Sequence, residues 1–239
     1  MNRTLIAAVL PGIFLLPSLA FAQSEVQAII DKAIAAHGGK DRLNRLKARY
    51  VKSKGVLHFA GGLPFTQEIY YEAPSRIKET TDVNKEQVIT TVFNGKEGWI
   101  ILNGKQQKVD KKILEELKEA AHQAQITRLI GLTDAALKLA PVQAEDDTLG
   151  VKVAAKGYRD LFLFFDKKTG RLVRTERQAL DMKSGELVKE VTRFSEWKTV
   201  DGITVPLKID VRRDGKRFME ATATEVKFYE KLDADIFKP

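Results

Sequence analysis

The side chains that most often carry out chemistry are sparse in this sequence. Its three histidines, His37, His58 and His122, lie far apart and show no metal-binding spacing. The motifs H-E-x-x-H and G-x-S-x-G do not occur, and without cysteine the chain has no thiol nucleophile or thiolate ligand. His37 precedes Gly38-Gly39, so we interpret it as a helix-end residue whose imidazole satisfies terminal carbonyl groups.

Two pairs of carboxylates are close enough in sequence to be considered for general acid and base catalysis. Asp146-Asp147, and Asp233 with Asp235, both stand among turn-forming residues, where surface or capping roles are more common. Neither pair is accompanied by a nucleophile or a metal-ligand motif. We therefore predict a protein that is not an enzyme and that has no metal and no cofactor.

The charge balance is basic, with a formal net charge of +8 and a pI near 9.5. Such an excess favours attraction to anionic lipid head groups or acidic polymers outside the cytoplasm, rather than to nucleic acid. Lysine and arginine are nevertheless interleaved with aspartate and glutamate along the chain, which indicates a solvated surface rather than one basic patch.

The N-terminus has the features of a secretory signal peptide. Arg3 supplies a positive region, and residues 5–19 form an apolar stretch that is too short and too interrupted to span a bilayer. Ala20-Phe21-Ala22 provides small residues for cleavage before Gln23. We predict a signal peptide over residues 1–22 and one periplasmic domain over residues 23–239; a retained membrane anchor is the alternative.

After one helix that ends near Gly38, the chain alternates strand-like segments with turn signals. Segments at regular spacing with glycine-containing turns are typical of an antiparallel meander rather than of βαβ units. The predicted strands are 49–59, 65–71, 76–82, 86–93, 98–102, 105–109, 151–155, 161–166, 171–178, 187–197, 203–213 and 218–229.

A helical insertion interrupts the meander over residues 110–140. Asp110 can cap a helix, and Thr133 or Asp134 can cap a short second helix that carries Leu137 and Leu139 and ends at Pro141. The apolar side of the first helix, which would form the underside of a lid, consists of Ile113, Leu117, Ala121 and Ala124.

The strand over 203–213 indicates which face of the sheet is buried. Its apolar residues alternate with polar ones, so one face is dry and the other wet, whereas 161–165 is apolar on both faces and central. A long curved sheet with a dry concave face is either a packed core or an apolar container under a movable cover, and the sequence leaves both open.

Several segments, in order, resemble the LolA and LolB family of periplasmic lipoprotein-sorting carriers. YYEAPSRI at 70–77 resembles the family's strand–proline–strand corner, and VFNGKEGW at 92–99 its next hairpin. FFDKKTGRLV at 164–173 resembles a late hairpin, while DGITVP at 201–206 and LDADIFKP at 232–239 resemble the closing strands and the F-x-P ending. The likeness extends over nearly all of residues 23–239.

This resemblance implies an α+β fold: a strongly curved antiparallel sheet forming an unclosed half-barrel, covered by an N-terminal helix and a central helical insertion. It also implies a monomeric carrier of acyl lipid or lipoprotein acyl chains, with transient contacts to inner- or outer-membrane partners and transfer to the outer membrane. The residues we expect to line the cavity are Leu57, Phe59, Phe65, Ile69, Tyr71, Trp99, Ile101, Leu163, Phe165, Val205, Leu207 and Ile209.

One departure from the family concerns the corner proline. The carrier commonly has arginine before this proline, whereas this chain has Ala73, so a gating role of that arginine does not transfer. The alternative function is a periplasmic sensor or protein-binding module that uses the same curved sheet.

Overall fold

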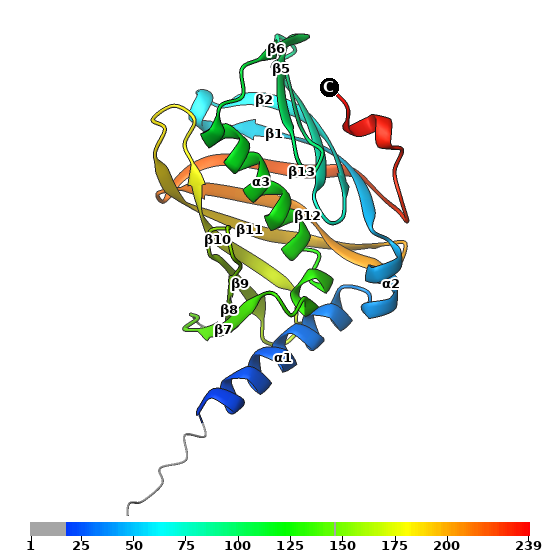
Figure 1. Ribbon diagram of the computed structural model, residues 1–239, viewed down its shortest axis with the longest axis vertical. Helices are drawn as coiled ribbons and strands as arrows, with labels where there is room; N and C mark the ends of the chain where they lie inside the picture. The colour runs from blue at the N-terminus through cyan, green and yellow to red at the C-terminus, as the bar shows by residue number, and fades with distance from the viewer. Residues whose placement is uncertain (1–17, 146) are drawn as a thin grey trace, which may run out of the picture.

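The computed structural model describes residues 18–145 and 147–239. Residues 1–17 of the predicted signal peptide, and Asp146 of one carboxylate pair, lie outside them. The described strands form a 13-stranded antiparallel sheet in the order β6-β5-β4-β3-β2-β1-β13-β12-β11-β10-β9-β8-β7. Figure 1 shows that this sheet curves strongly and that its two edges do not meet, which confirms the predicted unclosed half-barrel. No helix within 18–145 or 147–239 has the length and apolar character needed to cross a membrane.

The two halves of the sheet meet where β1 pairs with β13. The N-terminal half comprises β1 (Ala48–Leu57), β2 (Leu63–Glu72), β3 (Arg76–Val83), β4 (Gln87–Phe93), β5 (Gly98–Leu102) and β6 (Lys105–Gln107). The C-terminal half comprises β7 (Lys138–Val142), β8 (Thr148–Ala154), β9 (Leu161–Asp166), β10 (Leu172–Leu180), β11 (Leu187–Val200), β12 (Ile203–Arg213) and β13 (Lys216–Tyr229). Each predicted strand corresponds to one of these.

Local turn chemistry sets the register of the hairpins. Asn103-Gly104, Asp201-Gly202 and Asp214-Gly215 each take positive φ at both residues, between +46° and +78°. That is the conformation of a type I′ turn, which matches the twist of the flanking strands and which glycine and asparagine or aspartate adopt most easily. Asn94 instead accepts hydrogen bonds from the backbone of Lys96 and Glu97, both at 2.9 Å.

The inside of the curve is covered by the helices α1 (Ser18–Ala36), α2 (Lys40–Arg45) and α3 (Lys111–Ile126). The short 3₁₀ turns are η1 (His58–Ala60), η2 (Ile130–Thr133) and η3 (Ala234–Phe237), and η3 lies on the opposite face of the sheet. Because α3 follows β6 and precedes β7, it connects the two edges of the sheet, and Figure 1 shows it running across the front of the strands. Asp110 caps α3 as predicted, accepting a hydrogen bond from the Ile113 backbone at 2.9 Å.

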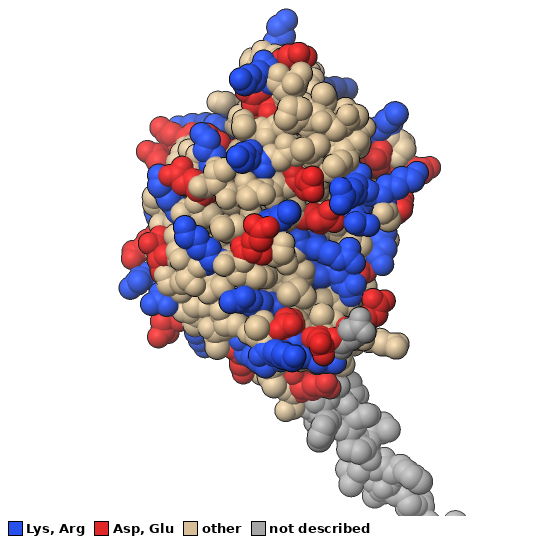
Figure 2. Space-filling model, turned by 180° about the vertical axis from the view of Figure 1, so that it is seen from behind, with Lys and Arg blue, Asp and Glu red and all other residues tan. Residues whose placement is uncertain are grey.

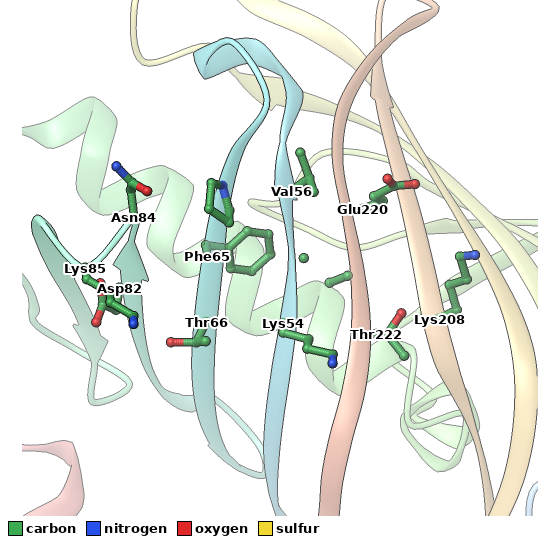
Figure 3. A pocket seen from close by; sticks show the side chains of 13 residues that line it. Lys54, Val56, Phe65, Thr66, Asp82, Asn84, Lys85, Lys208, Glu220 and Thr222 are labelled. Atoms are coloured by element: carbon green, nitrogen blue, oxygen red, sulfur yellow. The ribbon is translucent and has the colours of Figure 1, made fainter.

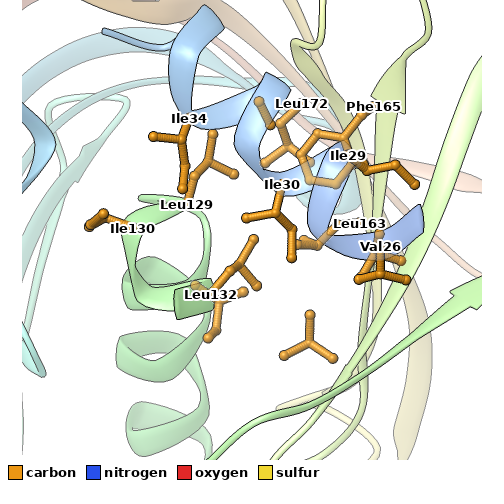
Figure 4. Packing of buried hydrophobic residues seen from close by; sticks show 14 of the residues in the cluster. Val26, Ile29, Ile30, Ile34, Leu129, Ile130, Leu132, Leu163, Phe165 and Leu172 are labelled. Carbon is orange, nitrogen blue, oxygen red and sulfur yellow. The ribbon is translucent and has the colours of Figure 1, made fainter. Parts of the chain in front are cut away.

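The main hydrophobic core lies between α1 and strands β8 to β10. Figure 4 shows Ile29 and Ile30 of α1 beside Leu163 and Phe165 of β9. Ala33 and Ile34, further along α1, are buried in the same core. A second cluster forms where the C-terminal segment packs on the opposite face of the N-terminal half; it contains Ala48, Val92, Leu232 and Phe237, with Tyr70, Trp99 and Ile236 against it.

One predicted element is wrong. Residues 138–142 form strand β7 rather than a second helix, and the preceding helical turn, η2, ends at Thr133. Leu139 pairs with Val153 and Pro141 with Val151. A proline removes a backbone donor, but β7 is an edge strand of the sheet, where one side of the ladder is unpaired and a proline is tolerated.

The surface agrees with the interleaved charges of the sequence. Figure 2 shows lysine and arginine interspersed with aspartate and glutamate over the back of the molecule. Ion pairs between neighbouring strands contribute to this pattern, among them Lys52 with Glu68 at 3.0 Å and Lys189 with Glu176 at 2.8 Å. Both signs of charge are therefore present over this face.

Replacing Gly170 with alanine is expected to loosen α1 from the sheet. A Cβ atom there would lie 2.9 Å from Cγ and 3.0 Å from the carbonyl oxygen of Lys32 in α1. Gly104 is the control, because its φ is similar, +77° against +73°, but no atom lies within 4 Å. We expect Gly170→Ala to lower the free energy of unfolding by about 1–3 kcal/mol more than Gly104→Ala, measured in urea. Equal losses would show that α1 does not depend on this contact.

Candidate ligand-binding cavity

A cavity of about 270 Å³ lies between the central strands and the segments at α2 and the end of α3. Strands β1, β2, β11, β12 and β13 form its floor. Its lining is mainly apolar and includes Leu43, Leu46, Val51, Ile69, Leu129, Phe194, Val205, Ile209, Val226 and Phe228. Apolar pockets with a few placed polar groups are the usual form of small-molecule sites.

The floor consists of rows of residues that pair directly across neighbouring strands; each such row is called a rung. Val51 of β1 pairs directly with Ile69 of β2 and with Val226 of β13, and paired side chains lie on the same face. These three residues make an apolar row across the junction between the two halves of the sheet. Two residues back along β1, Arg49 pairs with Tyr71 and Phe228 on the same face.

The end of α1 closes one side of the cavity. The backbone nitrogen of Gly39 donates to Ile34 at 2.9 Å, and Nδ1 of His37 lies 2.8 Å from the carbonyl oxygen of Ala33. The prediction that His37 is a helix-end residue is therefore confirmed. Its ring meets that of Trp197 edge-on at 5.4 Å, and burial lowers the pKa of His37.

The polar groups of the cavity surround Tyr71. Its hydroxyl donates to Oε1 of Gln125 at 2.9 Å, and burial raises the pKa of Tyr71 to about 12. Arg128 donates to the carbonyl oxygens of Leu43 at 2.6 Å and Leu46 at 3.2 Å, which ties the end of α3 to α2. Arg49 lies with its guanidinium carbon 5.6 Å from the centre of the Tyr71 ring.

The structure brings only some of the predicted lining residues to this cavity. Ile69, Tyr71, Val205 and Ile209 line it. Leu163 and Phe165 are buried in the main core under α1, so the sheet's dry face is partly packed rather than hollow. Leu57 and Phe65 belong to a third cluster with Val83 and Ala221.

The remaining predicted residues lie elsewhere. Trp99 packs with the C-terminal segment on the face opposite α3, because its neighbour Gly98 faces Leu117 of α3 and successive residues of a strand point to opposite faces. Phe59 is 61% exposed and stacks on Phe218 at 4.5 Å. Ile101 and Leu207 are half-buried and do not border the cavity.

Arg49 and Arg128 were not predicted to lie in a site. Arg49 shares its strand phase with Val51 and Ser53, and this alternation was a signal that its side chain faces the interior. Nothing in the local pattern indicated that Arg128, just after α3, would reach the carbonyl groups of α2. That contact depends on how distant parts of the chain pack.

The predicted lid helix lies across the sheet as expected, with Ala121 and Ala124 buried and Ile113 and Leu117 half-buried. Its polar side is held to the C-terminal half of the sheet. The carboxylate of Glu116 accepts hydrogen bonds from Arg159, from Arg177 at 2.8 Å and from the backbone of Leu180 at 3.1 Å. Glu119 accepts another from the backbone of Arg159 at 3.0 Å. These bonds join α3 to both β10 and the turn before β9.

A larger hollow of about 780 Å³ lies over β1, β2 and β13 (Figure 3). Charged side chains of both signs surround it, including Lys54, Lys208, Asp82 and Glu220. Long charged side chains keep their ends in water, while Val56, Pro64, Phe65 and Ala221 add an apolar lining, so this hollow is an open groove of mixed character. Of the predicted lining residues, Phe65 lies in it.

Comparison with solved structures shows which fold this is. A domain assigned to outer-membrane lipoprotein sorting from Vibrio parahaemolyticus is similar over 90% of this chain and 96% of its own, with TM-score 0.55 and 11% identity. A DUF1329 family protein from Desulfovibrio piger is similar over 89% and 97%, with TM-score 0.55 and 14% identity. A LolA superfamily protein from Nitrosomonas europaea is similar over 90% and 97%, with TM-score 0.53 and 12% identity.

These similarities confirm the predicted resemblance at the level of the fold. The chain has the LolA-type half-barrel, and the likeness extends over nearly the full length of each neighbour. No protein-family model matches the sequence, and no curated protein matches it.

The contact between Glu116 and the arginines predicts how firmly α3 is held. Glu116→Gln removes the charge that pairs with Arg159 and Arg177, both of which are largely buried. We expect hydrogen exchange of the α3 backbone amides to accelerate on the order of 10-fold, equivalent to about 1.4 kcal/mol. Glu115→Gln is the control, because Glu115 is exposed and, within the described part of the chain, pairs only with Lys111 at 3.9 Å. Equal exchange rates in the two variants would contradict this role of Glu116.

Proposed function

We propose that the protein is a periplasmic carrier that holds an acyl lipid, or the acyl chains of a lipoprotein, in the cavity beneath α2. The observation that carries this proposal is the row of apolar side chains, Ile69, Val51 and Val226, across the floor of a cavity inside the half-barrel. Each methylene that leaves water for such a surface contributes about 0.8 kcal/mol. A carrier gains affinity in this way without many directed contacts.

The fold supports a carrier or binding protein rather than an enzyme. Two of the similar structures are described as a lipoprotein-sorting domain and a LolA superfamily protein. Among the described residues, the cavity lining includes His37 and Tyr71 but no carboxylate that could act with them as an acid or base. We also propose that the protein acts as a monomer, contacts membrane partners transiently and transfers its cargo to the outer membrane.

The size of the cavity bears on how a ligand would enter. At about 270 Å³ it is just below the range of about 300–1,000 Å³ for ligand pockets, so it accommodates only part of a long chain. The cover consists of α2, a helix of 6 residues, held by the bonds from Arg128 to the carbonyl groups of Leu43 and Leu46. Movement of this short cover would enlarge the cavity, and it would also withdraw Leu43 from the edge of the main core.

Export is part of the proposal. The described helix α1 begins at Ser18, and among its residues 23–36, whose burial is described, the first buried one is Val26. Cleavage before Gln23 therefore leaves the described core contacts of α1 in place. We expect the intact mass of the protein from a periplasmic extract to correspond to residues 23–239. A mass that retains residues 1–22 would indicate a membrane anchor instead.

A bulky side chain on the cavity floor should displace the ligand. We expect Val226→Trp to reduce the acyl lipid that co-purifies from a periplasmic extract without detergent by about 10-fold or more, since it fills the central rung. Native mass spectrometry followed by lipid extraction measures this, and thermal unfolding checks that the variant is folded. Val88→Trp is the control because Val88 is 40% exposed on β4.

A different result would change the proposed class of protein. If the wild-type protein has a clean apo mass and takes up neither phospholipid nor acylated peptide, the carrier function is wrong. The alternative, a sensor or protein-binding module that uses the curved sheet, would then stand.

A further inference from the structure

Most interior arginines of this protein have carboxylate partners. Arg177 pairs with Glu116 and Glu190, both at 2.8 Å, and Arg213 pairs with Glu190 at 2.9 Å. Arg159 pairs with Glu116. Pairing of this kind is the normal condition for a charge taken out of water.

Arg49 is different. It forms no ion pair with a described residue, and its Nε, like that of Arg159, is buried without a hydrogen-bond partner. Its side chain lies beside the ring of Tyr71, on the rung that also contains Phe228. A guanidinium has five N–H donors and no acceptor, so an anion is the group that satisfies it best.

The charges around Arg49 also favour the binding of an anion. Lys47, Arg49 and Arg128 all line the cavity, and no aspartate or glutamate is among its described lining residues. Burial is the main cause that lowers the pKa of Arg49; Tyr71 opposes it, and the nearby positive charge of Arg128 acts in the same direction as burial. An anion at this point would relieve both the desolvation and the repulsion between the two arginines.

The apolar row begins next to these charges. Val51 follows Arg49 on the same face of β1, about 7 Å along the strand, and it pairs with Ile69 and Val226. A head group at Arg49 would therefore place the first methylenes of its chain on the apolar floor.

We propose that Arg49, with Arg128 beside it, binds the anionic head group of an amphipathic acyl ligand whose chain lies along Val51, Ile69 and Val226. The head group is a carboxylate or a phosphate, both of which accept paired hydrogen bonds from a guanidinium. This inference rests on the proposed carrier function and adds the chemical class of its cargo.

The test compares three probes with the same chain: dodecanoate, dodecyl phosphate and 1-dodecanol. Binding to delipidated protein is measured at pH 8 below the micelle concentration by calorimetry, and by the fluorescence of Trp197, which lines the cavity. We expect the wild-type protein to bind at least one anionic probe about 10- to 100-fold more tightly than the alcohol, the effect of a charge-assisted hydrogen bond. The anionic probe that binds more tightly identifies the head group as carboxylate or phosphate.

Arg49→Gln should abolish most of this preference. Its affinity for the anionic probe should fall about 10-fold or more, while its affinity for dodecanol should change less than about 2-fold. Arg45→Gln is the matched control, because it removes the same charge from an exposed position on α2. The comparison of probes on the wild-type protein does not depend on any variant being folded.

Two results would overturn the inference, and they differ from failure of the proposed function. Equal affinity of the wild-type protein for anionic and neutral probes would show that the cavity binds the acyl chain and does not distinguish the head groups. Equal loss of both kinds of probe in Arg49→Gln would show that Arg49 only supports the cavity. If no probe binds at all, the carrier function itself is wrong, and this inference falls with it.

Discussion

The pairing of β1 with β13 is the interaction on which the rest of the structure depends. It joins strands whose directly paired residues include Ala48 and Tyr229, near opposite ends of the described chain, and it turns two meanders into one sheet. The ladder shifts register between Lys52 and Ser53, a local irregularity of the kind that increases twist and curvature. The cavity floor is centred on this same ladder, so the junction of the two halves is also the candidate site.

The concave face is covered in two different ways, which answers whether the sheet encloses a packed core or a container. Under α1 the side chains interdigitate and leave a dry core that includes Ile30 and Leu163. Under α2 the cover is short and is held by hydrogen bonds to backbone carbonyl groups, and there a cavity remains. One part of the half-barrel therefore provides stability, while the neighbouring part has room for a ligand.

The sequence predicted what is encoded locally. The strands and hairpins follow from alternation and from turns such as Asn103-Gly104, and α3 follows from its cap at Asp110. The site could be predicted only in part, because each strand shows which side chains share a face but not what covers that face. Trp99 is partly buried because the C-terminal segment, far along the chain, packs on it, and β7 is a strand because it pairs with the neighbouring strand β8.

The central position of the first and last strands has a consequence for how the chain matures. As the polypeptide emerges from N- to C-terminus, β1 is available early but its partner β13 is the final strand to appear. Until then β1 has a free edge, and loop-closure entropy opposes a contact over such a long separation. The described sheet and its cavity can therefore be completed only after β13 has left the ribosome or a translocation channel. A chain crossing a membrane unfolded satisfies this order of events.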